Sequence, residues 1–139
     1  MKTEKQIQAY IQSIAEPKRA DMLILHNLFL KLLLPCKLWF LDGKNSEQKT
    51  VSNPNIGYGS YFAQYADGSK KEFYQIGLSA NSTGISVYIM GIVDKNYLPK
   101  TYGDKIGKAS VTGYCIKFKK LADINIDTLK VIIKERVKI

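Results

Sequence analysis

Residues 55–90 decide the fold: they read NIGYGSYFAQYADGSKKEFYQIGLSANSTGISVYIM. Three runs in which apolar and polar residues alternate are separated by turn sequences of the Asp-Gly and Asn-Ser-Thr-Gly kind. The predicted strands cover residues 56–65, 73–80 and 85–90. Because short turns join strands that run in opposite directions, the stretch predicts an antiparallel meander. Alternation in the second strand places Tyr74, Ile76 and Leu78 on one face.

Helical patterns flank the meander on both sides. Before it, apolar residues recur at helical spacing over residues 3–14. After it, the chain predicts a short helix over residues 94–102, a strand over residues 114–118 and a last helix capped by Asp127. This order indicates a single α+β domain over residues 1–139, in which an antiparallel meander packs against N-terminal and C-terminal helices.

A second N-terminal helix, predicted over residues 17–33, is apolar around most of its circumference. Polar residues mark only a narrow side, at Asp21, Asn27 and Lys31. A helix of this kind is expected to be buried on most of its surface. Two interpretations follow: the helix is the central element of the domain, or part of it lies in a subunit contact that makes the protein a homodimer.

The chain is basic, because 21 lysines and arginines against 12 acidic residues give a net charge of +9. A basic chain favours anionic partners, but these lysines are spread over every segment, so nucleic acid is not expected as the main partner. The most apolar run, residues 22–34, is too short for a bilayer and is interrupted by polar residues. The two cysteines, Cys36 and Cys115, are isolated and fit a reducing compartment. We therefore expect a cytoplasmic protein without a membrane segment.

Several separated blocks of the sequence resemble one family. The blocks are PKRAD at residues 17–21, Trp39, IGYGSY at 56–61, YADG at 65–68, IGLS at 76–79, VYIM at 87–90, GK at 107–108 and CIKFKKLADI at 115–124. In this order they resemble the domain of unknown function 1801 family, also called YdhG-like. The resemblance implies a small α+β fold similar to frataxin and YjbR-type proteins, with a frataxin-like iron-binding chaperone as an alternative function. The chain departs from the family after Trp39, where a polar insertion runs through Asn53.

Aromatic residues beside the glycines of the meander form the candidate ligand site. Tyrosine and tryptophan combine apolar area with a polar tip, which suits ligand and partner surfaces. The glycines indicate a bulge or a close approach rather than a phosphate loop, because a phosphate loop opens a helix. The lysines near the late strand, Lys105, Lys108, Lys117, Lys119 and Lys120, are candidates for an anion patch beside the aromatics, a combination that proteins binding single-stranded nucleic acid also use. No RNA-binding strand motif of the usual type is present, so a solvated face is the favoured interpretation of these lysines. The predicted site comprises Trp39, Tyr58, Tyr61, Gly57, Gly59 and Lys117. Alternatively, the tyrosines form an amphipathic sheet face whose hydroxyls reach water.

No catalytic constellation is recognisable in the sequence. His26 is the only histidine, and on the apolar second helix a structural role is expected for it. The acidic residues are scattered, so they predict no cluster of oxygen ligands, and no metal or cofactor is assigned. The sequence therefore favours a domain that binds a small molecule or a protein. The alternatives are the iron-binding chaperone and a weak nucleic-acid binder that acts through its lysines.

Overall fold

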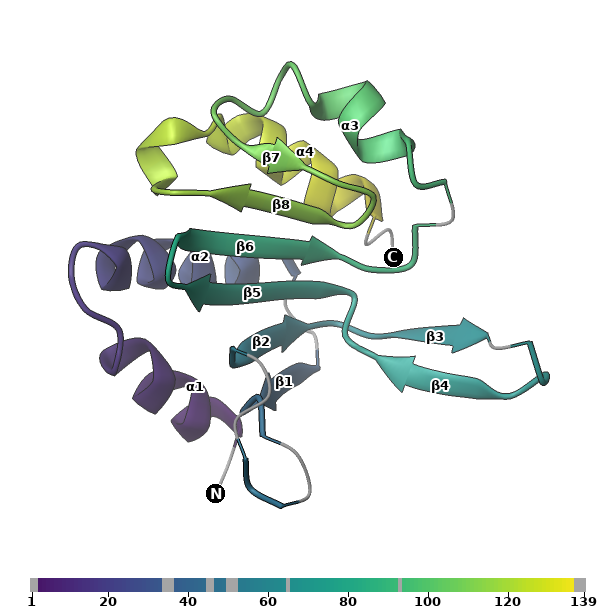
Figure 1. Cartoon of the computed structure of the whole chain (residues 1–139), viewed down its shortest axis with the longest axis horizontal. Helices are drawn as coiled ribbons and strands as arrows, with labels where there is room; N and C mark the ends of the chain where they lie inside the picture. Colours follow the sequence, from purple (N-terminus) through teal and green to yellow (C-terminus); the bar gives the residue numbers. More distant parts are fainter. Residues whose placement is uncertain are drawn as a thin grey trace.

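A six-stranded antiparallel sheet forms the centre of the molecule, with the strands in the order β1-β2-β5-β6-β8-β7 (Figure 1). The strands are β1 Leu38–Leu41, β2 Asn55–Tyr58, β5 Ile76–Asn81, β6 Gly84–Ile89, β7 Ser110–Val111 and β8 Cys115–Phe118. This computed structural model describes residues 3–33, 37–44, 47–49, 53–64, 66–92 and 94–136. The prediction of an α+β fold with an antiparallel sheet is confirmed.

The helices leave one face of the sheet uncovered. They are α1 Thr3–Gln12, α2 Lys18–Leu33, α3 Tyr97–Tyr102 and α4 Ile126–Arg136, with a short 3-10 helix, η1, at Leu121–Asp123. In Figure 1, α2 and α4 lie behind the sheet, so the face turned toward the viewer carries no helix. The core forms on the covered side, where sheet residues such as Val87 and Ile116 join Phe29 and Leu129 from the helices. Full burial of each such side chain contributes roughly 1.5 to 3 kcal/mol.

The long hairpin of the meander is interrupted halfway along its length. Strands β3 Tyr61–Gln64 and β4 Lys70–Phe73 form a separate two-stranded sheet beyond β2 and β5 (Figure 1). At the interruption Gly59 adopts a φ of +72°, a left-handed conformation that favours glycine. Tyr74 and Gln75 stand between β4 and β5 and belong to neither ladder. The meander of residues 55–90 therefore contains five strands rather than the three predicted.

The interruption also changes the direction of a side chain. Ile76 and Leu78 belong to the core cluster on the helix side, but Tyr74 lies on the opposite face, over Gly57 and Gly77. The prediction that Tyr74 shares a face with Ile76 and Leu78 is therefore wrong. Alternation assigns faces only within one unbroken ladder, and the ladder breaks immediately before Ile76.

Helix α2 is less buried than its composition predicts. Its buried residues are Met22, Leu25, Phe29 and Leu33. Leu23 and Ile24 are 44% and 53% exposed on the outer side, so this part of the helix is not covered within a single chain, and the subunit contact that would cover it stays a prediction. One apolar stripe is enough to hold the helix against the sheet. None of the helices in the described part of the chain has both the length and the apolarity needed to span a bilayer.

The last helix begins one residue earlier than the predicted cap. Asn125, not Asp127, caps α4: its side-chain oxygen accepts bonds from the backbone N–H groups of Asp127 and Thr128, at 3.0 and 3.2 Å. Asn and Asp are equally good caps by type, so the sequence alone did not separate the two positions. The strand expected over residues 114–118 is present as β8, and the helix expected over residues 94–102 is the shorter α3.

Candidate binding site on the open sheet face

The open face of the sheet has a floor of small residues. The positions that alternate with the core residues of β2, β5 and β6 include Gly57, Gly77, Ser79 and Ser86. Both serines are 1% exposed, and their hydroxyl groups are hydrogen-bonded: Ser79 donates to the carbonyl of Pro54 at 2.6 Å, and Ser86 accepts from Asn81 at 2.9 Å. Larger side chains at the two ends of the face therefore decide what can bind there.

Tyr74 fills the glycine part of this floor. A Cβ built on Gly57 would lie 2.6 Å from the Cβ of Tyr74, and one on Gly77 would lie 2.6 Å from its Cε1. The tyrosine ring therefore lies flat across both glycines, and it stacks on Phe73 with ring centroids 4.2 Å apart. The glycines serve the close approach of a side chain, in line with the interpretation of Gly57 as strand geometry rather than a phosphate loop.

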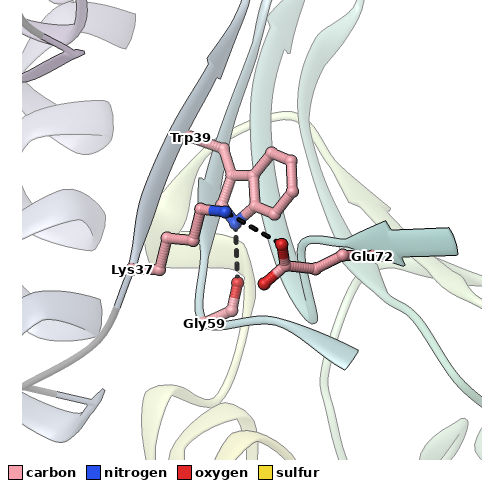
Figure 2. Close-up of polar contacts among 4 residues, drawn as sticks. All are labelled: Lys37, Trp39, Gly59 and Glu72. Carbon is pink, nitrogen blue, oxygen red and sulfur yellow. Dashed lines mark hydrogen bonds and ion pairs between the residues drawn. The ribbon is translucent and has the colours of Figure 1, made fainter. Parts of the chain in front are cut away.

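Trp39 is held by a polar cluster beside this aromatic pair (Figure 2). Its indole N–H donates to the carbonyl of Gly59 at 2.8 Å, which ties β1 to the interruption of the hairpin. The ammonium group of Lys37 lies 4.3 Å from the indole ring centroid and 3.0 Å from Oε1 of Glu72. The hydrogen bond from Lys37 lowers the pKa of the Glu72 carboxyl. The polar atom of Trp39 is thus satisfied within the protein.

The six predicted site residues lie in four separate places. Trp39, Gly57 and Gly59 meet at the cluster described above. Tyr58 lies on the helix side with no exposed surface, and its hydroxyl is 2.6 Å from Nδ1 of His26. Lys117 lies on β8, where it pairs with Ser86 of β6, and the ring of Tyr61 lies near Gly91. Strand parity separates Tyr58 from its two glycine neighbours, and the strand order separates Lys117 from Trp39.

A hollow of about 500 Å³ surrounds Lys117 at one end of the open face. Its lining residues are Thr83, Ile85, Lys108, Ala109, Ser110, Lys117, Phe118, Lys119 and Asp123. Three ammonium groups therefore face a single carboxylate. The ion pairs found in the described part of the chain are Arg19–Glu16, Lys37–Glu72 and Lys49–Glu47, and none of them uses a lysine of the hollow. The sequence indicated Lys117 as a candidate for an anion patch, but it gave no signal that Ser110 would line it, because β7 is only two residues long.

The basic surface continues past the hollow. A second hollow of about 300 Å³ shares Thr83 and Lys119 with the first and adds Lys18 and Lys120. Asp21 also lines it, but its carboxylate accepts a hydrogen bond from the backbone N–H of Leu121 at 3.0 Å. The turn between β5 and β6 therefore sits among lysines on both sides.

An aromatic pair lies at the other end of β8. The rings of Tyr88 and Tyr114 are nearly parallel, with an interplanar angle of 21° and centroids 6.1 Å apart. Tyr114 is 54% exposed, which makes it one of the most exposed large apolar residues in the described part of the chain. Beside them Cys115 is 3% exposed, and burial raises the pKa of its thiol. This end of the face is aromatic, whereas the Lys117 end is charged.

The side chains best suited to acid–base or nucleophilic chemistry do not meet. His26 lies on the helix side of the sheet beside Tyr58, and burial lowers its pKa. Cys115 lies on the open face beside Ser86 and Lys117. Among the described residues, no three His, Cys, Asp or Glu side chains lie close enough together to hold a metal ion.

Comparison of the chain with family models, with curated proteins and with solved structures found no match. The site is therefore interpreted from its own residues.

Proposed function

We propose that this protein is a binding domain that takes an anionic small molecule in the Lys117 hollow. The observation that carries the proposal is the set of three lysines around one hollow, Lys108, Lys117 and Lys119, with Asp123 as the only carboxylate among those lining residues that the structure describes. Ammonium groups that share a hollow repel one another, and an anion between them relieves that repulsion. The net basic charge of the protein also raises the rate at which anions reach it.

The other walls of the hollow suit a small ligand with one charged end. Ser110 supplies a hydroxyl group, which is both a donor and an acceptor, on the strand next to Lys117. The half-buried Ala109 supplies an apolar methyl group, whereas Ile85 and Phe118, which also line the hollow, are only 1% and 5% exposed because their side chains lie in the core. A ligand that places phosphate or carboxylate oxygens among the lysines and a less polar part toward the sheet would use both kinds of wall.

Calorimetric titration with inorganic pyrophosphate at low salt tests the proposal. We expect binding that weakens as salt is added, because these lysines are solvent-accessible. Lys117→Ala should weaken binding about fivefold, since an exposed charge contributes on the order of 1 kcal/mol. The matched control is Lys71→Ala, which removes the same charge from the exposed strand β4. No binding, or an equal loss in both variants, would refute the proposal.

Three further expectations from the sequence remain proposals. On the sequence resemblance, we propose membership of the YdhG-like family, with a frataxin-like iron chaperone as an alternative function. Anaerobic titration with ferrous iron tests that alternative, and saturable micromolar binding would displace the anion proposal as the main function. A cytoplasmic location rests on the isolated cysteines. A homodimer through α2 rests on the exposed Leu23 and Ile24, and sedimentation at high protein concentration tests it.

A further inference from the structure

We propose that the Lys117 hollow and the aromatic pair Tyr88–Tyr114 together form one site for a nucleotide, with the phosphate among the lysines and the base on Tyr114. The inference rests on the proposed function, because it uses the same hollow as the anion site. It adds the class of ligand: a phosphate joined through a sugar to a flat aromatic base.

The strand register brings the two ends of the site to the right separation. Tyr88 pairs with Cys115, and Ser86 pairs with Lys117, so Tyr88 and Lys117 lie on the same face of the sheet. Tyr114 precedes Cys115 and stands three residues before Lys117, and three residues of a strand span about 10 Å. A base, a ribose and a 5′-phosphate together span a distance of this order.

The surface between the two ends is built on two small side chains, Ser86 and Cys115, which are 1% and 3% exposed. The side chain of Tyr88 lies over part of it, because its hydroxyl group is hydrogen-bonded to Ser86. A sugar that crosses from Lys117 to Tyr114 would therefore lie against Tyr88.

Tyr114 is suited to stacking because it is exposed and yet anchored. More than half of its surface is accessible, and its ring is backed by the nearly parallel ring of Tyr88. Its backbone carbonyl accepts a hydrogen bond from the N–H of Ile89 at 2.7 Å, which fixes the residue to the neighbouring strand. Every base has an aromatic face, so stacking on such a platform tolerates any base.

A phosphate joined through a sugar to a base occurs both in a free nucleotide and in each unit of a single-stranded nucleic acid. The second hollow shares Lys119 with the first and adds Lys120, so the next phosphate of a strand would also meet lysines; Lys18 lines it too, but its ammonium group donates to the carbonyl of Asn81 at 2.5 Å. A strand should therefore bind more tightly than one nucleotide and lose more affinity with salt. A free nucleotide would use the first hollow alone.

Titration with ribose 5-phosphate, AMP, UMP and a six-residue oligoadenylate tests the inference. We expect AMP and UMP to bind about fivefold or more tightly than ribose 5-phosphate, since stacking of one base adds at least that factor. Tyr114→Ala should remove this advantage and leave ribose 5-phosphate binding unchanged, whereas Tyr114→Phe should retain the advantage. The control is Phe62→Ala, which removes another exposed aromatic ring, 66% accessible, from β3.

The outcomes separate this inference from the proposed function. If AMP binds no better than ribose 5-phosphate, or if Tyr114→Ala changes neither, the nucleotide inference is overturned while the anion site stands. If AMP, ribose 5-phosphate and pyrophosphate all fail to bind, the nucleotide inference and the proposed anion site are both refuted. Oligoadenylate that binds more tightly than AMP, and depends on Tyr114, identifies a single strand as the source; equal affinity identifies the free nucleotide.

Discussion

Replacement of Gly57 by alanine should destabilise the protein more than any other glycine-to-alanine change in the sheet floor. A Cβ at this position would lie 2.6 and 2.7 Å from Cβ and Cδ2 of Tyr74 and 2.8 Å from the Cβ of Trp39. Two of these three atoms are Cβ atoms, which move only with their backbone. Relief of the overlap therefore requires β1 or the interruption of the hairpin to shift.

The magnitude follows from what must be displaced. An added methyl group in a packed site costs about 1 to 3 kcal/mol. Tyr74 is 5% exposed, and loss of a buried aromatic side chain costs about 3 to 5 kcal/mol. We expect Gly57→Ala to lower the free energy of unfolding by about 3 kcal/mol. Gly77→Ala should cost about 1 to 2 kcal/mol, because its overlaps, at 2.6 to 2.9 Å, are with the far end of the Tyr74 ring, which can swing away.

A double-mutant cycle with Tyr74→Ala isolates the contact. In the Tyr74→Ala background, Gly77→Ala should be neutral or stabilising by up to about 1 kcal/mol, because alanine reduces the entropy of the unfolded chain. Gly59→Ala is the control: its nearest neighbour would be 3.8 Å away, so its cost of about 1 to 2 kcal/mol comes from the φ of +72° and should be the same in both backgrounds.

Urea unfolding measures all of these variants, followed by far-UV circular dichroism and by the fluorescence of Trp39. Trp39 is the only tryptophan, and its ring centroid is 6.1 Å from that of Phe73, the partner on which Tyr74 stacks. Its emission therefore reports on this cluster. A Gly57→Ala variant that unfolds at the wild-type urea concentration with unchanged emission would refute the placement of Tyr74 across the glycines.

Three further predictions concern the helices and their contacts. Burial lowers the pKa of His26 below its ordinary 6.5, so just below pH 6.5 the unfolded chain binds a proton that the folded protein does not bind. The stability that comes from the neutral form of His26 is therefore complete above pH 6.5 and is lost as the pH falls below that value. His26→Gln should therefore flatten the decline of the urea midpoint between about pH 7.5 and 5.5, and an unchanged decline would contradict the burial of His26. Tyr58→Phe should lower the free energy of unfolding by about 1 kcal/mol at pH 7.5, because it removes the hydrogen bond to His26. If the same loss is found in the His26→Gln background, it does not come from this hydrogen bond. Asn125→Ala should cost about 1 kcal/mol in thermal unfolding through loss of the cap of α4, whereas Asp127→Ala should cost less; the reverse order would restore Asp127 as the cap.

The general architecture could be predicted because it depends on patterns within single elements. The alternation of residues 85–90 and the late strand around Ile116 survive in β6 and β8. Both strands pair along unbroken ladders, and their apolar residues enter the core. The sequence pattern is sufficient wherever a strand stays regular from one end to the other.

The candidate site was predicted only in part, because it depends on which strands become neighbours. Tyr58 and Gly57 are adjacent in sequence, but strand parity places Tyr58 on the helix side beside His26. Lys117 was a candidate for an anion patch, and a hollow with further lysines does surround it, but Ser110 reaches it only through the pairing of β7 with β8. No local pattern carries such information about pairing.

The break in the hairpin links the fold to the position of the site. Because the ladder stops after Tyr58, Tyr74 turns away from the core and covers Gly57 and Gly77. That half of the open face is thereby filled by the protein's own side chain, and its neighbour Trp39 is satisfied by the carbonyl of Gly59. What stays accessible is the half built on β6, β8 and β7, where Tyr114 and the lysines lie. The close approach of Tyr74 to Gly57 and Gly77 thus leaves the accessible part of the face at the other end of the sheet.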